Sequence, residues 1–237
     1  MFQYILFDLD GTLTDPKVGI TKSVQYALQA LGIEEPDLDK LDPFIGPPLK
    51  DSFMEFYGFH HEQTEIAVEK YRERFVVTGI FENEIYAGIA QMLANLHCAG
   101  KKLAIASSKP TVLVERILEH FAIQAYFDVV VGSEMDGTRS RKEEVVEEAL
   151  RRLVPQIFVN PSERSAEESS IQQINKKALR KSIAMVGDRK FDIEGAKAFG
   201  LTGIGVAFGY AQEGELEQAG ADYIVETVAE LERLLMK

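Results

Sequence analysis

The feature that most constrains this chain is a short apolar run that leads directly into two aspartates. Residues 4–7 read Tyr-Ile-Leu-Phe, Asp8 and Asp10 follow, and Gly11 comes next. A continuous apolar run of this length predicts a buried strand of a parallel sheet. Side chains alternate along a strand, so both carboxylates can point the same way, and the glycine permits a sharp turn. Ligands of open α/β sheets bind outside the carboxyl ends of the strands, so we expect a site here.

The two neighbouring carboxylates predict a bound cation. Like charges held close together need a compensating charge, or one of them must be protonated. Mg²⁺ suits this position because it is a hard cation that prefers oxygen ligands. Asp-Gly can also be a simple turn signal, which would explain Asp10 and Gly11 but not a charge at Asp8, at the end of a buried strand.

The order of the remaining elements predicts an α/β fold with a helical insertion. Residues 15–82 carry helical patterns only. After them, helical patterns alternate with short apolar runs, which predicts a doubly wound parallel sheet. The expected strands are residues 103–106, 127–131, 182–186, 202–206 and 222–225.

This alternation predicts two domains. We expect an α/β core made of residues 1–14 and 83–237, and a small all-helical cap domain made of residues 15–82. The hinges should lie near residues 14–15 and 81–83. Residues 154–180 are polar and longer than an ordinary connection of about 2–6 residues. We interpret them as a surface insertion, partly helical near 171–180, and favour a flexible loop over a partner contact.

Composition excludes several classes of partner. The chain has 237 residues, of which 26 are basic and 38 acidic, so its net charge is −12. General binding to nucleic acid or to anionic membranes needs a basic surface and is disfavoured. Cys98 is the single cysteine, which excludes an intramolecular disulfide, and we expect it to pack within a helix. Without a signal peptide or a membrane-spanning run, we expect a cytoplasmic protein, either a monomer or a homodimer.

Polar residues follow other expected strands at what should be the same edge of the sheet. Ser107 and Ser108 follow residues 103–106 and should lie at the start of a helix, where they could bind phosphate or simply cap the helix. Asp188 follows residues 182–186, and its spacing from Asp192 would place both on one helix face. These acids could be metal ligands or only helix caps. Lys142, at a helix start, could supply a fixed cation or belong to a solvated charge cluster.

Together these residues resemble the motifs of the haloacid dehalogenase superfamily of aspartate-nucleophile phosphatases. Asp8-Leu9-Asp10-Gly11-Thr12 matches the first motif, and the resemblance covers nearly the whole chain. The helical insertion resembles a cap, and residues 46–49 and 136–142 resemble the phosphoglycolate phosphatase branch. The sequence departs from the family at Ser107, where threonine is common, and in the length of residues 154–180. The other motifs are matched by Ser107, by Lys142, and by Gly187-Asp188 with Asp192.

The resemblance implies a mechanism and a set of site residues. Asp8 would attack phosphorus to form an aspartyl-phosphate, Asp10 would act as general acid and then as general base, and Lys142 would offset the charge of the transferring phosphate. Lys50 in the cap would contact a remote anionic group of the substrate, or else be a solvated lysine. Mg²⁺ would be held by Asp8, the Asp10 backbone, Asp188 and Asp192, while Ser107, Ser108 and the backbone of Leu9 would bind the substrate.

We therefore expect a Mg²⁺-dependent phosphatase that acts on a small phosphorylated metabolite, such as a phosphoglycolate-like monoester. A 5′-nucleotidase, a pyrophosphatase, a phosphomutase and a non-catalytic binding module on the same fold remain alternatives. A dehalogenase is disfavoured, because Asp10 and a Mg²⁺ site have no purpose in halide displacement.

Overall fold

Residues 4–7 form the strand around which the fold is built. A computed structural model describes residues 1–158 and 175–237. Its six-stranded sheet is parallel and has the order β5-β4-β1-β6-β7-β8. These strands are β1 (Tyr4–Phe7), β4 (Lys102–Pro110), β5 (Val129–Ser133), β6 (Ile183–Gly187), β7 (Thr202–Val206) and β8 (Tyr223–Val225). The predicted doubly wound α/β fold is confirmed.

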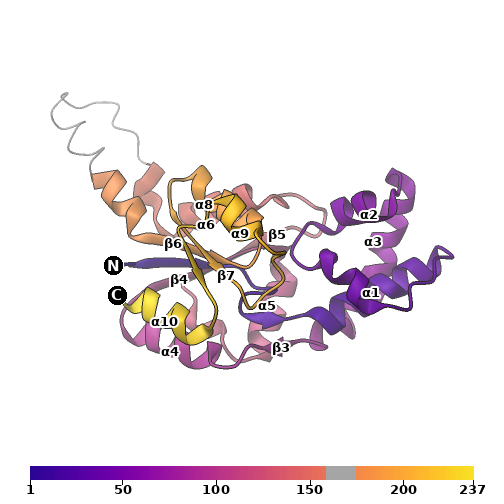
Figure 1. Cartoon of the computed structure of the whole chain (residues 1–237), viewed down its shortest axis with the longest axis horizontal. Coiled ribbons are helices and arrows are strands. Elements are labelled where there is room, and N and C mark those ends of the chain that lie inside the picture. Colours follow the sequence, from indigo (N-terminus) through magenta and orange to yellow (C-terminus); the bar gives the residue numbers. More distant parts are fainter. Residues whose placement is uncertain (159–174) are drawn as a thin grey trace.

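Helices cover both faces of the sheet, as the alternation of side chains in β1 requires. Ile5 and Phe7 pack into one apolar cluster with α4 (Ile89–Cys98), α5 (Thr111–His120) and α10 (Val228–Met236). Leu6 points the other way and packs with α6 (Lys142–Leu153) and α8 (Lys190–Ala198). Figure 1 shows α4 and α10 on one side of the strands and α6 and α8 on the other. A short helix, α9 (Glu215–Ala219), lies between β7 and β8 in the chain.

The residues between β1 and α4 form a helical layer at one end of the molecule. It contains α1 (Lys17–Ala30), α2 (Leu49–Tyr57), α3 (His61–Phe75) and two 3₁₀ helices, Leu38–Phe44 and Gly79–Phe81. Figure 1 shows α1, α2 and α3 together at the end of the molecule far from both termini. An antiparallel pair of two-residue strands, β2 (Thr14–Asp15) and β3 (Glu84–Ile85), carries the chain into and out of this layer. The pair lies where the hinges are expected.

Three expectations about local structure need correction or fall outside the described residues. The strand expected at 103–106 extends to Pro110, so the next helix starts only at Thr111. Cys98 is exposed rather than packed, because it is the last residue of α4 and faces solvent. Of the expected insertion, residues 175–181 are helical and 159–174 lie outside the described part of the chain. None of the described helices has the length and apolar character needed to cross a membrane.

Candidate active site

Three aspartates from two separate parts of the chain meet at the carboxyl edge of the sheet. Asp8 directly follows β1, Asp188 directly follows β6, and Asp192 lies in the first turn of α8. All three are buried, and one carboxylate oxygen from each lies within 4.8 Å of the others. Asp188 and Asp192 do not share a helix face as expected, because α8 begins at Lys190 and Asp188 precedes it. They converge because the chain turns between β6 and α8.

The Asp188 carboxylate is fixed by its neighbours. The Thr12 hydroxyl donates to its Oδ1 at 3.2 Å, and the Tyr210 backbone N–H donates to its Oδ2 at 2.8 Å. Gly11 has a φ of +77°, and a Cβ added there would lie 2.2 Å from Asp188 Oδ2. A side chain at residue 11 would therefore both strain the turn and displace the carboxylate.

Lys142 lies between these carboxylates. Its Nζ is 2.9 Å from Asp8 Oδ2 and 2.8 Å from Asp192 Oδ1, and it donates to the Ala106 carbonyl at 3.1 Å. Burial disfavours its charged form, but Asp192 and Asp8 outweigh burial and raise the pKa of Lys142. The lysine is therefore a fixed cation whose position follows from the start of α6 directly beside the sheet edge.

The charge of the cluster suits a bound divalent cation. Three buried carboxylates face one ammonium group. Burial raises the pKa of Asp188 well above its usual value and raises that of Asp192 to about 6, with the other carboxylates acting in the same direction. A Mg²⁺ ion would offset this excess of negative charge, and carboxylate oxygens are its preferred ligands. Asp8, Asp188 and Asp192 are therefore the side chains that fit a metal.

The carboxylate of Asp10 has a different partner, Lys109, which the sequence analysis missed. Lys109 Nζ lies 2.6 Å from Asp10 Oδ2, and both side chains are largely buried. The same ammonium lies 4.7 Å from the centre of the Phe75 ring of α3. Burial raises the pKa of Asp10, while Lys109 acts in the opposite direction. β4 continues to Pro110, and its register against β5 shifts between Ala106 and Pro110, so Lys109 reaches Asp10 from the irregular end of this strand.

The expected phosphate-binding residues lie near the aspartates, with a different local structure from the one predicted. Ser107 is buried, and its hydroxyl accepts from the Lys109 backbone N–H at 3.4 Å. Neither Ser107 nor Ser108 lies at a helix terminus, because both belong to β4. The Leu9 side chain is fully buried, and its N–H donates to Asp8 Oδ1 at 2.8 Å, so only its backbone can face a substrate.

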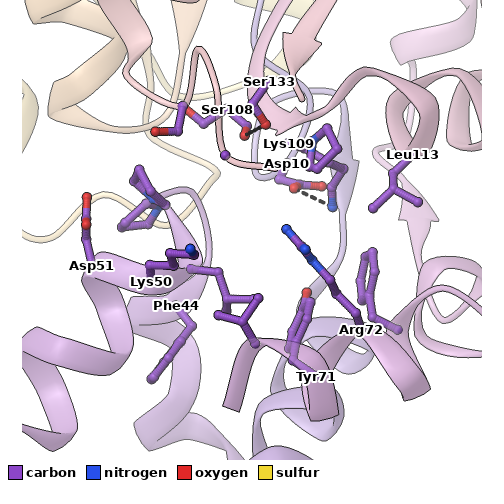
Figure 2. A pocket seen from close by; sticks show the side chains of 18 of the residues that line it. Asp10, Phe44, Lys50, Asp51, Tyr71, Arg72, Ser108, Lys109, Leu113 and Ser133 are labelled. Atoms are coloured by element: carbon purple, nitrogen blue, oxygen red, sulfur yellow. Dashed lines mark hydrogen bonds and ion pairs between the residues drawn. The ribbon is translucent and has the colours of Figure 1, made fainter. Parts of the chain in front are cut away.

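A pocket of about 260 Å³ adjoins Asp10 and Lys109 and extends toward the helical layer. Figure 2 shows Tyr71 and Arg72 reaching into it from α3, opposite Asp10 and Ser108. Lys50 also lines the pocket, but its Nζ lies 2.5 Å from Glu65 Oε1. The apolar residues of the lining include Ile20, Phe44, Pro47, Pro48, Leu49, Val68, Phe75 and Leu113. Sequence analysis could not identify Arg72, because its position in a charged helical stretch is typical of a solvated side chain.

Comparison with known proteins agrees with this geometry. The model of the haloacid dehalogenase-like hydrolase family matches residues 5–206. A 5′-nucleotidase from Pseudomonas aeruginosa is 43% identical over 231 residues, which cover 98% of this chain and 94% of the relative. The tyrosine-protein kinase PtkA from Mycobacterium tuberculosis is 33% identical over 235 residues, which cover 98% of this chain and 72% of that protein.

A solved structure gives the same result for the fold. The crystal structure of a predicted phosphatase from Clostridium acetobutylicum superimposes with a TM-score of 0.85, at 42% identity, and covers 100% of this chain and 99% of its own. The resemblance seen in the sequence motifs is therefore confirmed, and this chain belongs to the haloacid dehalogenase-like hydrolases.

Proposed function

We propose that the protein is a Mg²⁺-dependent phosphomonoesterase that uses Asp8 as its nucleophile. The observation that carries this proposal is the buried cluster in which Lys142 contacts Asp8 and Asp192, with Asp188 beside them. This cluster lies at the carboxyl edge of the sheet, and Asp10 connects it to a pocket large enough for a small molecule. When bound, Mg²⁺ supplies positive charge that reduces the repulsion between the Asp8 carboxylate and a phosphate dianion.

The side chains support a reaction in two steps. In the first, an Asp8 oxygen forms a bond to phosphorus as the ester P–O bond breaks, and Asp10 gives its proton to the leaving oxygen. Burial raises the pKa of Asp10, which favours the protonated form that this step needs. In the second, Asp10 takes a proton from the water that attacks phosphorus, and Asp8 leaves as a carboxylate. In both steps, Lys142 and the hydrogen-bond donors near Asp8 offset the negative charge on the phosphoryl oxygens.

Among the candidate esters, nucleoside 5′-monophosphates are supported best. The wall of the pocket opposite Asp10 is largely apolar and includes the aromatic rings of Phe44, Tyr71 and Phe75. The two-carbon leaving group of phosphoglycolate, or the phosphate that leaves from pyrophosphate, would leave most of that wall without contact. A nucleoside would cover it, and the printed name of the relative from Pseudomonas aeruginosa, 5′-nucleotidase, points the same way.

The experiment measures release of inorganic phosphate from p-nitrophenyl phosphate, UMP and 2-phosphoglycolate, with Mg²⁺ or with EDTA. The proposal predicts that EDTA abolishes release and that Asp8→Asn abolishes it while the protein stays folded. Asp128→Asn is the matched control, because it makes the same change directly before β5, where Asp128 accepts from the N–H of Leu103 near the amino end of β4. Normal phosphate release by the Asp8→Asn variant would contradict the proposal.

A further inference from the structure

We propose that Arg189 is a positioning residue that couples the metal-binding carboxylates to the loop of residues 45–48 in the helical layer. This loop connects the 3₁₀ helix Leu38–Phe44 to α2, and all of its residues except Ile45 line the pocket. The coupling itself is a property of the folded protein, while its effect on substrate binding rests on the proposed function.

The first observation is the place of Arg189 in the chain. It directly follows Asp188 and directly precedes α8, whose first turn carries Asp192. Its backbone N–H donates to Asp192 Oδ2 at 3.0 Å. The backbone of Arg189 is therefore held between two of the three carboxylates that fit a metal, so a change in their separation moves it.

The second observation is the direction of the Arg189 side chain, which is buried and leaves the core for the helical layer. Its Nε lies 2.9 Å from Glu215 Oε1, and its Nη1 donates to the Ile45 carbonyl at 2.6 Å. The Lys190 backbone N–H donates to the same Glu215 oxygen at 2.8 Å. Glu215 therefore orients the guanidinium toward the loop, and a hydrogen bond from a charged donor is stronger than one between neutral groups.

The third observation is that this contact has no equivalent elsewhere between the two layers. Between residues 16–81 and residues 84–158 or 177–237, the bond from Arg189 to Ile45 is the one hydrogen bond, and no ion pair joins these parts. The other charged contacts are with aromatic rings and involve other elements, as between Arg116 of α5 and the ring of Phe81, 5.3 Å apart. The position of the loop relative to the sheet edge therefore depends on Arg189.

Gly46 keeps the loop in contact with the stem of the same arginine. Its φ is +102°, and a Cβ added there would lie 3.0 Å from Arg189 Cγ. A side chain at residue 46 would strain the backbone and press the loop away from Arg189.

These contacts connect the metal site to the pocket. Without a cation, the buried carboxylates repel one another, which loosens the turn that carries Arg189. Mg²⁺ bound to Asp188 and Asp192 would fix that turn, and Arg189 would in turn fix the Ile45 carbonyl. Coupling between two sites is reciprocal, so the docked loop should also strengthen the binding of Mg²⁺.

Hydrogen exchange without substrate tests the coupling in the full-length protein. In the unmodified protein, Mg²⁺ should slow exchange at the amides of Ile45 and Gly46 about fivefold or more. In Arg189→Met, exchange there should be fast with and without Mg²⁺, while β1 and β6 stay protected. Arg116→Met is the matched control, because it removes another core arginine that contacts the helical layer, and it should leave the Mg²⁺ effect unchanged.

Gly46→Ala tests the same contact from the other side and keeps every charge, so it also gives an answer if Arg189→Met does not fold. It should abolish the Mg²⁺ effect on exchange at Ile45 and raise the dissociation constant of Mg²⁺ about fivefold, measured by calorimetry. Gly58→Ala is its matched control, since Gly58 has a φ of +64° and a Cβ there meets nothing within 4 Å. That variant should leave both quantities unchanged.

Kinetics test the consequence for the substrate. In Arg189→Met, KM for p-nitrophenyl phosphate should rise about tenfold, the lower end of what a hydrogen bond to a charged group contributes, and kcat should change less. Arg189→Lys can still donate to the Ile45 carbonyl and should recover part of the loss in KM.

Two results would overturn the coupling: no effect of Mg²⁺ on exchange at Ile45 and Gly46 in the unmodified protein, or an effect that survives both Arg189→Met and Gly46→Ala. An unchanged KM in Arg189→Met would overturn the role in substrate binding. If Mg²⁺ slows exchange through Arg189 but supports hydrolysis of no ester, the proposed function fails and the coupling stands.

Discussion

Replacing Lys142 by methionine tests how the buried charges are balanced. In the folded protein its ammonium contacts Asp8 at 2.9 Å, Asp192 at 2.8 Å and the Ala106 carbonyl at 3.1 Å. Methionine fills a similar volume but leaves the buried carboxylates without that cation. Removing one partner of a buried ion pair costs about 3–5 kcal/mol, because the remaining charge stays buried and uncompensated. We expect the free energy of unfolding to fall by about that amount at pH 7 in the absence of Mg²⁺.

Urea unfolding of the metal-free protein measures this loss. With a slope of about 3 kcal/mol/M for a chain of this size, the midpoint should fall by about 1–2 M. Mg²⁺ should return part of the loss, because it supplies the missing positive charge to the folded state only. Adding Asp192→Asn to Lys142→Met should also return part of the lost stability, because it removes one of the uncompensated charges. The double variant should therefore lose less free energy of unfolding than the two single variants lose in sum, by about 0.5–3 kcal/mol. A metal-free Lys142→Met protein as stable as the unmodified one would refute this account of the cluster.

Other predictions concern the contact between the sheet edge and the helical layer, the pH dependence of stability, and the turnover of the intermediate. Arg189 donates to the Ile45 carbonyl at 2.6 Å, so Arg189→Met should speed hydrogen exchange at the backbone amides of Ile45 and Gly46, and unchanged exchange would count against this contact. The pKa of Asp192 is raised to about 6 from 3.8, so the folded metal-free protein takes up a proton before the unfolded chain does. Its stability should therefore rise by about 1–3 kcal/mol as the pH falls from 7 toward 5, measured by urea unfolding, and a fall over that range would contradict the assignment. Asp10→Asn should slow both chemical steps in rapid-quench kinetics, and normal rates would remove Asp10 from acid–base chemistry.

The arrangement of the sheet could be predicted because the signals for it are local. Apolar runs such as residues 4–7 and 182–186 are too short for helices and are separated by helical periodicity, which leaves a parallel α/β sheet as the consistent solution. The aspartates at the ends of β1 and β6 then had to meet at one edge. Their convergence followed from topology, even though the helix face expected for Asp188 and Asp192 was wrong.

The residues that sequence analysis missed depend on tertiary contacts. The sequence predicts that the strand of residues 103–106 ends before Ser107, because Ser107, Ser108 and Lys109 are polar. In the fold these three residues remain in β4, beside β5. Lys109 therefore reaches Asp10, a contact between residues 99 positions apart. Arg72 was missed for the same reason. Helical periodicity predicts which residues share a face of α3, but it does not predict that this face lines a pocket. Conversely, apolar neighbours suggested that Cys98 was packed, yet the end of α4 leaves it exposed.

The central claim, that Asp8 carries the phosphoryl group, is tested most directly by trapping the intermediate. The Asp10→Asn variant is mixed with substrate and Mg²⁺, quenched in acid within the first turnover, digested and examined by mass spectrometry. The account predicts a peptide in which Asp8 has gained the mass of one phosphoryl group, and no such peptide from a protein that also carries Asp8→Asn. Turnover without phosphorylation of Asp8, or with the phosphoryl group on another residue, would contradict it.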